Sequence, residues 1–205
     1  MIISYYGGHY LKISQGDTVL SVNPPSKSSK QKVPRFGASL VLCSNHYPDY
    51  YSTEQNTYGE QVPLIIEGPG DYESKEILIK GIATKTTLDK KEYINTVYSL
   101  LMEGVNICIL GPLGESLKAS DKGRIDSPEI LFISLREDTL SPSELYKLAV
   151  SFEANIIIPV DYSEKTLTAF LKEAGNMSPE KVDKLTLKKK DIFGKQTEII
   201  LINEE

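Results

Sequence analysis

The pattern of apolar residues changes near residue 128, and this change limits the folds that the chain can adopt. Before it, the chain reads as short segments in which apolar and polar residues roughly alternate, separated by turn sequences such as Gly-Gly and Gln-Gly-Asp. That pattern is typical of β-strands joined by tight turns. The expected strands lie at residues 1–7, 9–15, 17–23, 38–44, 62–68, 76–83, 95–102 and 105–111.

After residue 128, apolar strand-like segments alternate with amphipathic helical patterns. We expect Ser141 or Ser143 to open the first helix, Ser163 to cap the second, and Gly175 to end it. Residues 178–185 indicate a further helical turn. The expected strands are 128–135, 155–162 and 197–203, and the expected helices are 141–154 and 163–175.

A β-rich half followed by a strand–helix–strand–helix half favours two mixed sheets packed face to face, with helices outside. Glu103-Gly104 between two strand patterns indicates a hairpin. A length of 205 residues favours one domain over 1–205. We therefore expect a single α/β domain with a layered sandwich architecture.

One loop concentrates residue types that carry chemistry. CSNHYPDYY, residues 43–51, directly follows the apolar segment ASLVL. The carboxyl end of a strand is where α/β-type sheets often place catalytic loops. A metal site, a nucleophile site or the remains of one are the interpretations that this loop allows.

Composition narrows these interpretations. The chain has only two histidines, His9 and His46, so a zinc site of His and Cys would need nearly all the ligands available. The net charge is −5, and the short run Lys188–Lys190 is the one basic cluster that stands out. Nucleic-acid binders show a larger basic footprint, so we expect no nucleic-acid partner.

The remaining features indicate a cytoplasmic protein. Cys43 and Cys108 lie in apolar strand-like segments and are expected to be buried thiols in a reducing compartment. The N-terminus lacks the basic and apolar regions of a signal peptide, and no apolar run is long enough to span a bilayer. No membrane partner is expected.

Six segments, in order along most of the chain, resemble the metallo-β-lactamase-fold family of metal-dependent hydrolases, in its ascorbate-phosphate lactonase-related branch. The resemblance implies a four-layer αββα sandwich. The segments are GGHYLKIS, TVLSVNPP, PRFGASLVLCSNHYPDY, EGPGDYESKEILIKGI, NTVYSLLMEGVNICILGPLGE and NIIIPVDY. His9 matches a family histidine that lies outside the metal shell, and we expect it to be a hydrogen-bonded structural residue.

The family's metal ligands are replaced at most of the matching positions. Within the S/T-H-x-H-x-D-H loop, Asn45, Tyr47 and Tyr50 stand where the family has histidines, while Ser44 and Asp49 match the pattern. Beyond the loop, the family's G-D-L-G aspartate and I-P-x-H-Y histidine are also replaced. The vestigial site positions that the resemblance implies are Ser44, Asn45, Tyr47, Asp49, Tyr50, Pro112 and Asp161.

An atypical metal site remains an alternative hypothesis. His46, Asp49 and Asp161 are the possible weak ligands, for zinc or manganese. Catalytic zinc needs three well-aimed ligands, and His46 is shifted by one position from either matching histidine. The preferred expectation is therefore no metal, no cofactor and no catalytic residue.

The tyrosines of the loop allow two interpretations. Tyr47, Tyr50 and Tyr51, with Tyr58 nearby, could fill the former metal cavity with apolar rings whose hydroxyls bond to neighbouring polar groups. They could instead form an exposed recognition surface. The sequence leaves both open.

These observations predict a degenerate member of the family, a non-catalytic pseudo-enzyme. Its partner is expected to be an unidentified protein, a small-molecule ligand or a second copy of the chain. The first alternative is a hydrolase with an unusual mono-metal or metal-independent site around Asp49 and Asp161. A nucleic-acid-associated protein is the weaker alternative.

Overall fold

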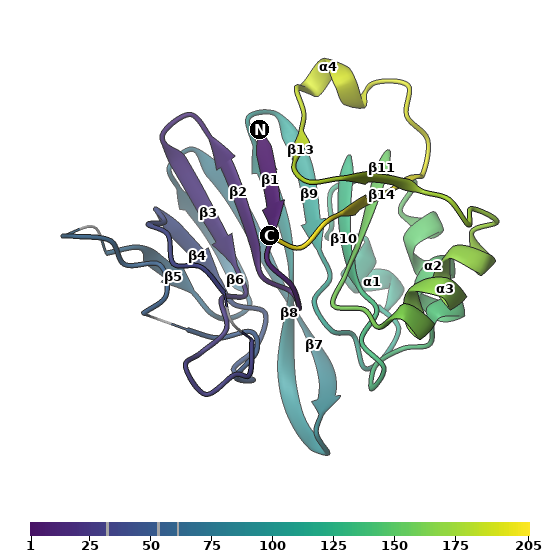
Figure 1. Ribbon diagram of the computed structural model, residues 1–205, viewed down its shortest axis with the longest axis horizontal. Helices are drawn as coiled ribbons and strands as arrows, with labels where there is room; N and C mark the ends of the chain where they lie inside the picture. The colour runs from purple at the N-terminus through teal and green to yellow at the C-terminus, as the bar shows by residue number, and fades with distance from the viewer. Residues whose placement is uncertain (32, 53, 61) are drawn as a thin grey trace.

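The computed structural model describes residues 1–31, 33–52, 54–60 and 62–205, and it contains two β-sheets packed face to face (Figure 1). The first sheet has the strand order β13-β1-β2-β3-β4-β5. Its strands are β1 (Ile2–Tyr5), β2 (Leu11–Gln15), β3 (Thr18–Val22), β4 (Leu40–Leu42), β5 (Leu64–Ile66) and β13 (Leu185–Thr186).

The second sheet has eight strands in the order β12-β14-β11-β10-β9-β8-β7-β6. The pairs from β6 to β9 are antiparallel, and those from β9 through β10, β11 and β14 to β12 are parallel. The strands are β6 (Gly70–Ser74), β7 (Ile77–Leu88), β8 (Lys91–Met102), β9 (Val105–Ile109), β10 (Ile130–Ser134), β11 (Ile156–Val160), β12 (Glu180–Val182) and β14 (Glu198–Ile202).

Both expected helices are present, with the predicted caps. Ser141 caps α2 (Pro142–Ser151) and Ser163 caps α3 (Glu164–Glu173), each accepting a hydrogen bond from a backbone N–H in the first turn. Two single-turn helices, α1 (Ala119–Lys122) and α4 (Lys189–Ile192), were not predicted. Four residues are too few to show a helical periodicity.

Apolar side chains fill two layers. The larger core lies between the sheets and includes Leu20, Leu42, Ile107 and Phe132. A second core packs the outer face of the second sheet against α2 and α3, through side chains such as Phe170. The predicted sandwich of two mixed sheets, packed face to face with helices outside the second, is confirmed.

The outer face of the first sheet is covered differently from the second. Phe36, Ala38 and Tyr51, from the chain before and after β4, pack on Val41 and Cys43 of that face. All the helices in the described ranges begin after residue 118. Loop side chains therefore provide the covering layer here.

Two secondary-structure expectations need correction. Residues 178–185 were predicted as a helical turn, but β12 occupies Glu180–Val182 and pairs with β14. Pairing with a neighbouring strand outweighs a weak local helix propensity. Strands β7 and β8 are each twelve residues long, because Thr84–Leu88 and Lys91–Asn95 continue the ladder into a long hairpin.

The hairpin at Glu103-Gly104 is confirmed, since both residues have positive φ angles and join β8 to β9. Cys43 and Cys108 are free and buried, as predicted. Among the described helices, none combines the length and apolar character needed to cross a membrane.

The topology brings several loops to one end of the sandwich. Residues after β10 and β11 emerge there because these strands are parallel neighbours. The tip of the β7–β8 hairpin projects beyond the sheets at the same end, at the bottom of Figure 1, where Asp89 bonds to a side chain of the loop after β4.

Asn56 fixes the loop layer to the first sheet. Its amide oxygen accepts a hydrogen bond from Ser21 Oγ at 2.9 Å, and its amide nitrogen donates to Tyr10 Oη at 3.1 Å and to the Phe36 carbonyl at 3.3 Å. The side chain is buried. Every polar atom of this amide is therefore used.

We expect Asn56→Ala to lower the free energy of unfolding by about 2–3 kcal/mol, because it leaves buried partners without hydrogen bonds. Urea unfolding at neutral pH measures this. The control is Gln55→Ala, which removes one 3.4 Å bond to Arg35 and should cost under about 0.5 kcal/mol. Equal losses for the two variants would contradict the anchoring role of Asn56.

Candidate functional site

The candidate site lies where the loops after β4, β10 and β11 meet. Residues 44–50 follow β4, Arg136 follows β10, and Asp161 directly follows β11. Hydrogen bonds and charges connect all three segments. The structure thus brings together residues that are more than 100 positions apart.

Tyr50 occupies the centre of this site and is completely buried. Its hydroxyl donates a hydrogen bond to Asp161 Oδ2. Its ring meets the ring of His9 edge to face, with centroids 5.9 Å apart, and lies 6.0 Å from the ring of Tyr47. Burial, reinforced by the charge of Asp161, raises the pKa of Tyr50 well above its ordinary value, so the phenol keeps its proton.

Asp161 makes two further hydrogen bonds. Ser134 Oγ donates to Asp161 Oδ2 at 3.4 Å, and the Asp161 backbone N–H donates to Tyr5 Oη at 3.2 Å. Its φ angle is +51°, a left-handed conformation that costs a non-glycine residue energy. Burial raises the pKa of its carboxyl, although the Tyr50 hydroxyl and the charge of Arg136 act in the opposite direction.

Arg136 supplies positive charge to the site, and the sequence analysis did not identify it. Its Nη1 lies 3.7 Å from Asp49 Oδ2, its Nε donates to Asp138 at 2.7 Å, and its guanidinium stacks over Tyr47, 5.2 Å from the ring centroid. Burial opposes its charge, but Tyr50, Asp138 and Asp161 raise the pKa of Arg136 above its ordinary value. The guanidinium is therefore a permanent cation in contact with Asp49 and Asp138, and its charge also acts on Asp161.

One sequence signal could have indicated Arg136. It is a basic residue two positions after the end of an apolar strand, at the sheet edge where the other site residues lie. The comparison with family motifs missed it because none of the matched segments covers that loop.

Asp49 has both carboxylate oxygens engaged. Ser29 Oγ donates to Oδ1 at 2.6 Å, and Oδ2 faces Arg136. The side chain is about one quarter exposed. Asp49 therefore links the β3–β4 loop to the cation.

Ser44 and Asn45 are used for local structure. The Ser44 N–H donates to Asn23 Oδ1 at 2.6 Å, the Ser44 carbonyl accepts from the Thr96 N–H at 2.7 Å, and Asn45 Oδ1 accepts from the Tyr47 N–H at 2.9 Å. Within the described ranges, Asn23 Nδ2, Ser44 Oγ and Asn45 Nδ2 are buried without a hydrogen-bond partner. Two of these three atoms are amide nitrogens, which do not ligate metals.

Pro112 and His46 do not contribute to the cluster. Pro112 is buried in the loop after β9 and carries no side-chain donor or acceptor. His46 is more than half exposed, lies 3.6 Å from Glu67, and meets the ring of Tyr51 edge to face at 4.6 Å. The side-chain neighbours of His46 therefore differ from those of Asp49 and Asp161.

His9 differs from its expectation. The sequence predicts a hydrogen-bonded histidine, but its side chain is completely buried and neither ring nitrogen has a partner in the described part of the chain. Packing against Tyr50 takes the place of hydrogen bonding. Burial lowers the pKa of His9 to about 3, so its ring is neutral across the physiological range.

The tyrosine cluster divides between the two interpretations that the sequence allows. Tyr50 fills buried space, whereas Tyr47 reaches the surface and donates to Asp89 at 2.5 Å. Tyr51 is half-buried on the outer face of the first sheet. Tyr58 is three-quarters exposed.

These residues do not fit the divalent metal ion that the fold family implies. Within the described residues, no group of three or more His, Cys, Asp or Glu side chains could hold a metal. Tyr50 keeps its proton, Asn45 Oδ1 already accepts a hydrogen bond, and both oxygens of Asp49 are engaged. The guanidinium of Arg136 would also repel a second cation at this position.

Comparisons with known proteins agree with the fold. The family model described as a beta-lactamase superfamily domain matches residues 2–161. A search of curated proteins gave no match.

Three solved structures illustrate the structural similarity. A putative zinc-dependent hydrolase of the metallo-β-lactamase superfamily from Thermotoga maritima has a TM-score of 0.73 and 22% identity, over 98% of this chain and 97% of that chain. A putative metal-dependent hydrolase from Parabacteroides distasonis has a TM-score of 0.62 and 17% identity, over 85% and 89%. The metallo-β-lactamase-fold protein YhfI from Bacillus subtilis has a TM-score of 0.63 and 11% identity, over 99% and 96%.

The buried neutral His9 predicts a loss of stability in acid. Its folded-state pKa of about 3 lies below the unfolded value near 6.5, so the unfolded chain takes up the proton first as the pH falls. Stability should therefore decrease as the pH falls from about 6.5 towards 3, with His9 contributing a loss of about 3 kcal/mol by pH 4.

The test compares His9→Phe with the wild type by urea unfolding at pH 7 and pH 4. The phenyl ring preserves the contact with Tyr50 and does not titrate, so the variant should lose about 3 kcal/mol less between these pH values. An unchanged pH dependence would show that the pKa of His9 is the same in the folded and the unfolded chain.

Proposed function

We propose that this chain, which belongs to the beta-lactamase superfamily, is a metal-independent pseudo-enzyme that binds a partner or ligand without transforming it. No cofactor is part of this proposal. The site residues Ser44, Asn45, Tyr47, Asp49, Tyr50, Pro112 and Asp161 are interpreted as positions that have lost a metal-binding role.

The observation that supports the proposal is the contact set of Arg136. The guanidinium faces Asp49, and its charge acts on both Tyr50 and Asp161. Buried carboxylates without a nearby cation destabilise a fold by several kcal/mol. A covalently attached cation can supply that compensation without any bound ion.

In this proposal, Arg136 takes the place of the metal charge and Tyr50 takes the place of a metal ligand. Its buried ring occupies volume beside His9, and its hydroxyl satisfies one oxygen of Asp161. A well-packed aromatic ring stabilises the core through its buried apolar area. The site thus has a packed apolar centre and internally paired charges, whereas a hydrolytic metal site keeps an open coordination position for water.

A cavity of about 460 Å³ beside the site supports a binding role. Loop residues 28–31, 47–49 and 88–93 contribute to its lining. The rings of Tyr47 and Tyr93 meet edge to face 5.8 Å apart, and Lys91 lies 5.2 Å from the Tyr93 ring centroid. Both rings are partly exposed, and aromatic rings next to cations are features of recognition surfaces.

Three classes of partner are proposed. A small molecule or an unidentified protein fits the cavity beside Tyr47, and a second copy of the chain is a further possibility. The net charge of −5 disfavours nucleic acid. The cytoplasm is the proposed location, consistent with the free thiols of Cys43 and Cys108.

The competing proposal, a hydrolase with a mono-metal site, would use His46, Asp49 and Asp161. It would require His46 to leave Glu67 and Tyr51, and Arg136 to leave Asp49. No contact among the described residues favours that rearrangement, and the pseudo-enzyme is the function that the geometry supports best.

Metal analysis tests the proposal. Protein purified without chelator or affinity metal, then incubated with zinc or manganese and desalted, should retain well under one ion per chain. Its melting temperature should also be unchanged by either metal or by a chelator. A ligand at 100 times its Kd would stabilise the folded state by about 2.7 kcal/mol, which is readily measured.

Retention of one zinc or manganese per chain, with a higher melting temperature, would contradict the proposal and favour the hydrolase alternative. The variant Asp49→Asn distinguishes the two further. Metal binding at this site should disappear in the variant, whereas adventitious surface binding should persist.

A further inference from the structure

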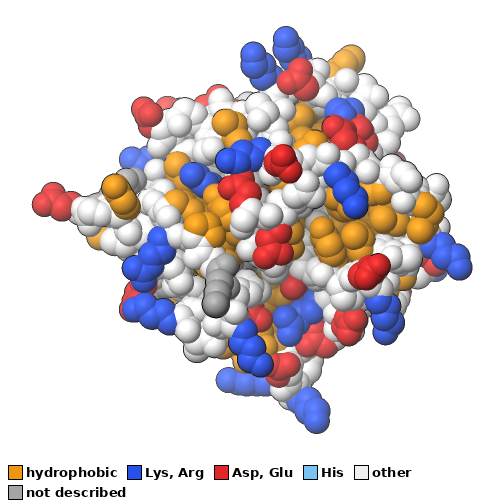
Figure 2. All heavy atoms as spheres, in the orientation of Figure 1, with side chains coloured by type: hydrophobic (Ala, Val, Ile, Leu, Met, Phe, Trp, Pro, Cys, Tyr) orange, Lys and Arg blue, Asp and Glu red, His pale blue; other side chains and the backbone are white. Residues whose placement is uncertain are grey.

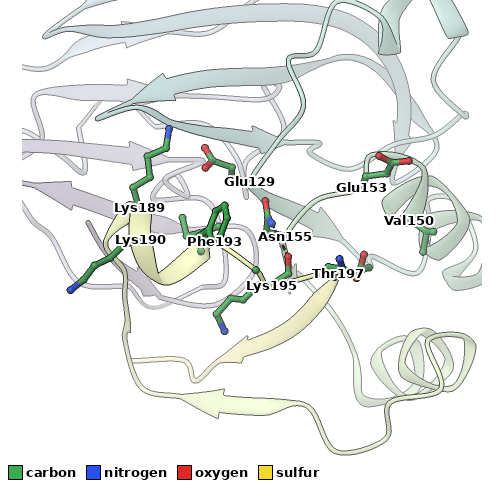
Figure 3. Close-up of a pocket in the computed structure, with 12 residues that line it drawn as sticks. Glu129, Val150, Glu153, Asn155, Lys189, Lys190, Phe193, Lys195 and Thr197 are labelled. Atoms are coloured by element: carbon green, nitrogen blue, oxygen red, sulfur yellow. Dashed lines mark hydrogen bonds between the residues drawn. The ribbon is translucent and has the colours of Figure 1, made fainter.

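A second hollow lies at the opposite end of the sandwich from the candidate site. It has a volume of about 1100 Å³ and lies between residues 189–197 and the amino ends of three parallel strands (Figure 3). Glu129, Asn155 and Thr197 line it, each directly preceding β10, β11 or β14. We call it the α4 hollow.

The α4 hollow is independent of the candidate site. Arg136 and Asp161 follow the carboxyl ends of β10 and β11, whereas the hollow lies before their amino ends. Each strand has five residues, which corresponds to a separation of about 16 Å.

The walls of the hollow are held by specific contacts. The chain crosses here from β13 in the first sheet to β14 in the second. Ile192 is buried in the main core, Asn155 Nδ2 donates to the Lys195 carbonyl at 2.7 Å, and Lys189 donates to the Gly104 carbonyl. A concave site that is fixed before binding loses little entropy when a ligand enters.

Apolar side chains line the hollow without being covered. Phe193 is 92% exposed, and Val150 on the opposite wall is 41% exposed. The neighbouring Ile192 is buried, so the segment places one apolar side chain in the core and presents the next one beside the hollow. Covering a phenyl ring with an apolar ligand removes apolar surface from water, which favours binding.

Positive charge gathers on the α4 side. Lys189, Lys190 and Lys195 line the hollow, and Lys195 is paired with Glu198. Figure 2 shows Lys or Arg side chains, with an acidic and a hydrophobic one among them, at the top of the molecule, over α4. In the described ranges, Lys190 makes neither a salt bridge nor a side-chain hydrogen bond. The carboxylate of Glu129 is already engaged, since it accepts a hydrogen bond from the Asn106 N–H at 2.9 Å.

The α4 hollow has a charged end and an apolar end. In Figure 3, Lys189 and Lys190 lie at one end, Phe193 lies between, and Val150 lies at the far end near Glu153. An anionic group is therefore favoured at the α4 end, and an apolar chain is favoured along Phe193 towards Val150.

We infer that the α4 hollow binds an amphipathic anion with a single apolar chain, of which a medium-chain fatty acid is the simplest example. The carboxylate lies at Lys190, since Lys189 already donates to the Gly104 carbonyl, and the chain covers Phe193. This assignment gives a role to the basic run Lys188–Lys190. A nucleic acid would use the lysines but would leave Phe193 and Val150 uncovered.

Calorimetric titration of the full chain with dodecanoate, below its micelle concentration, tests the inference. We expect saturable binding of one molecule per chain. Phe193→Ser should weaken it by about tenfold, because the ring loses its apolar contact. Lys190→Glu should weaken it by about fivefold, because a repulsive charge replaces an attractive one. Both side chains are exposed, so both variants should keep the wild-type melting temperature.

Matched controls come from elsewhere on the surface. Met177→Ser removes another exposed apolar side chain, and Lys172→Glu reverses another exposed lysine. Both should change the dissociation constant by less than about twofold. Dodecyltrimethylammonium, which has the same chain and a positive head group, should bind at least about tenfold more weakly than dodecanoate.

Three results would overturn the inference. The first is no saturable binding of dodecanoate. The second is equal weakening by the control variants, which would indicate non-specific adsorption. The third is binding of vesicles with anionic phospholipids that depends on Phe193 while dodecanoate fails to bind, which would reassign the segment to a membrane surface. None of these results bears on the metal content of the candidate site.

Discussion

The cation of Arg136, which lies 3.7 Å from the carboxylate of Asp49 and whose charge acts on the buried Asp161, is the interaction on which the organisation of the candidate site depends. Desolvated carboxylates are costly in a protein interior, and their cost is lowered most by a nearby positive charge. A divalent ion is one source of that charge, and a side chain is another. In this chain the guanidinium lies where it acts on Asp49, Tyr50 and Asp161 together. The contacts of the other site residues are consistent with a positive charge at this position.

Backbone geometry holds the loops around the candidate site. Asn23 and Asp161 both have positive φ angles, and both lie directly after a strand, β3 and β11 respectively. Such conformations cost energy for residues other than glycine, but Asn and Asp tolerate them better than most. The side chain of Asn23 caps the backbone of Ser44, and Asp161 accepts from Tyr50. The scaffold thus fixes the loops, while the side chains determine what the loops can hold.

Much of the fold was predictable from the sequence because it rests on local patterns. Ser141 and Ser163 mark helix starts by their capping chemistry, and Glu103-Gly104 marks a hairpin by its tolerance of positive φ angles. The strand β12 was mispredicted because its three residues are stabilised by pairing with β14, and the local sequence does not reveal that pairing. The single-turn helix α4 is held by burial of Ile192, which no periodicity reveals.

The candidate site was predictable only in part, for a similar reason. Motif positions indicated Tyr50, Asp49 and Asp161, but the sequence does not state which side chains from other loops meet them. Arg136 and Ser29 belong to loops outside the matched segments, and their contacts with Asp49 appear only once the chain is folded. The environment of His9 was also hidden, because burial against Tyr50 depends on strands far apart in the chain.

A double-mutant cycle between Arg136 and Asp161 tests the central claim most directly. The variants are Arg136→Met, Asp161→Asn and the double variant, each unfolded in urea at pH 7. Asn tolerates the positive φ angle at this position, so the cycle reports on charge with little change in backbone strain. If the guanidinium compensates the carboxylate, the double variant should be more stable than the sum of the single effects predicts, by about 1.5 kcal/mol. Additive effects, within about 0.3 kcal/mol, would show that the guanidinium of Arg136 does not compensate the charge of Asp161.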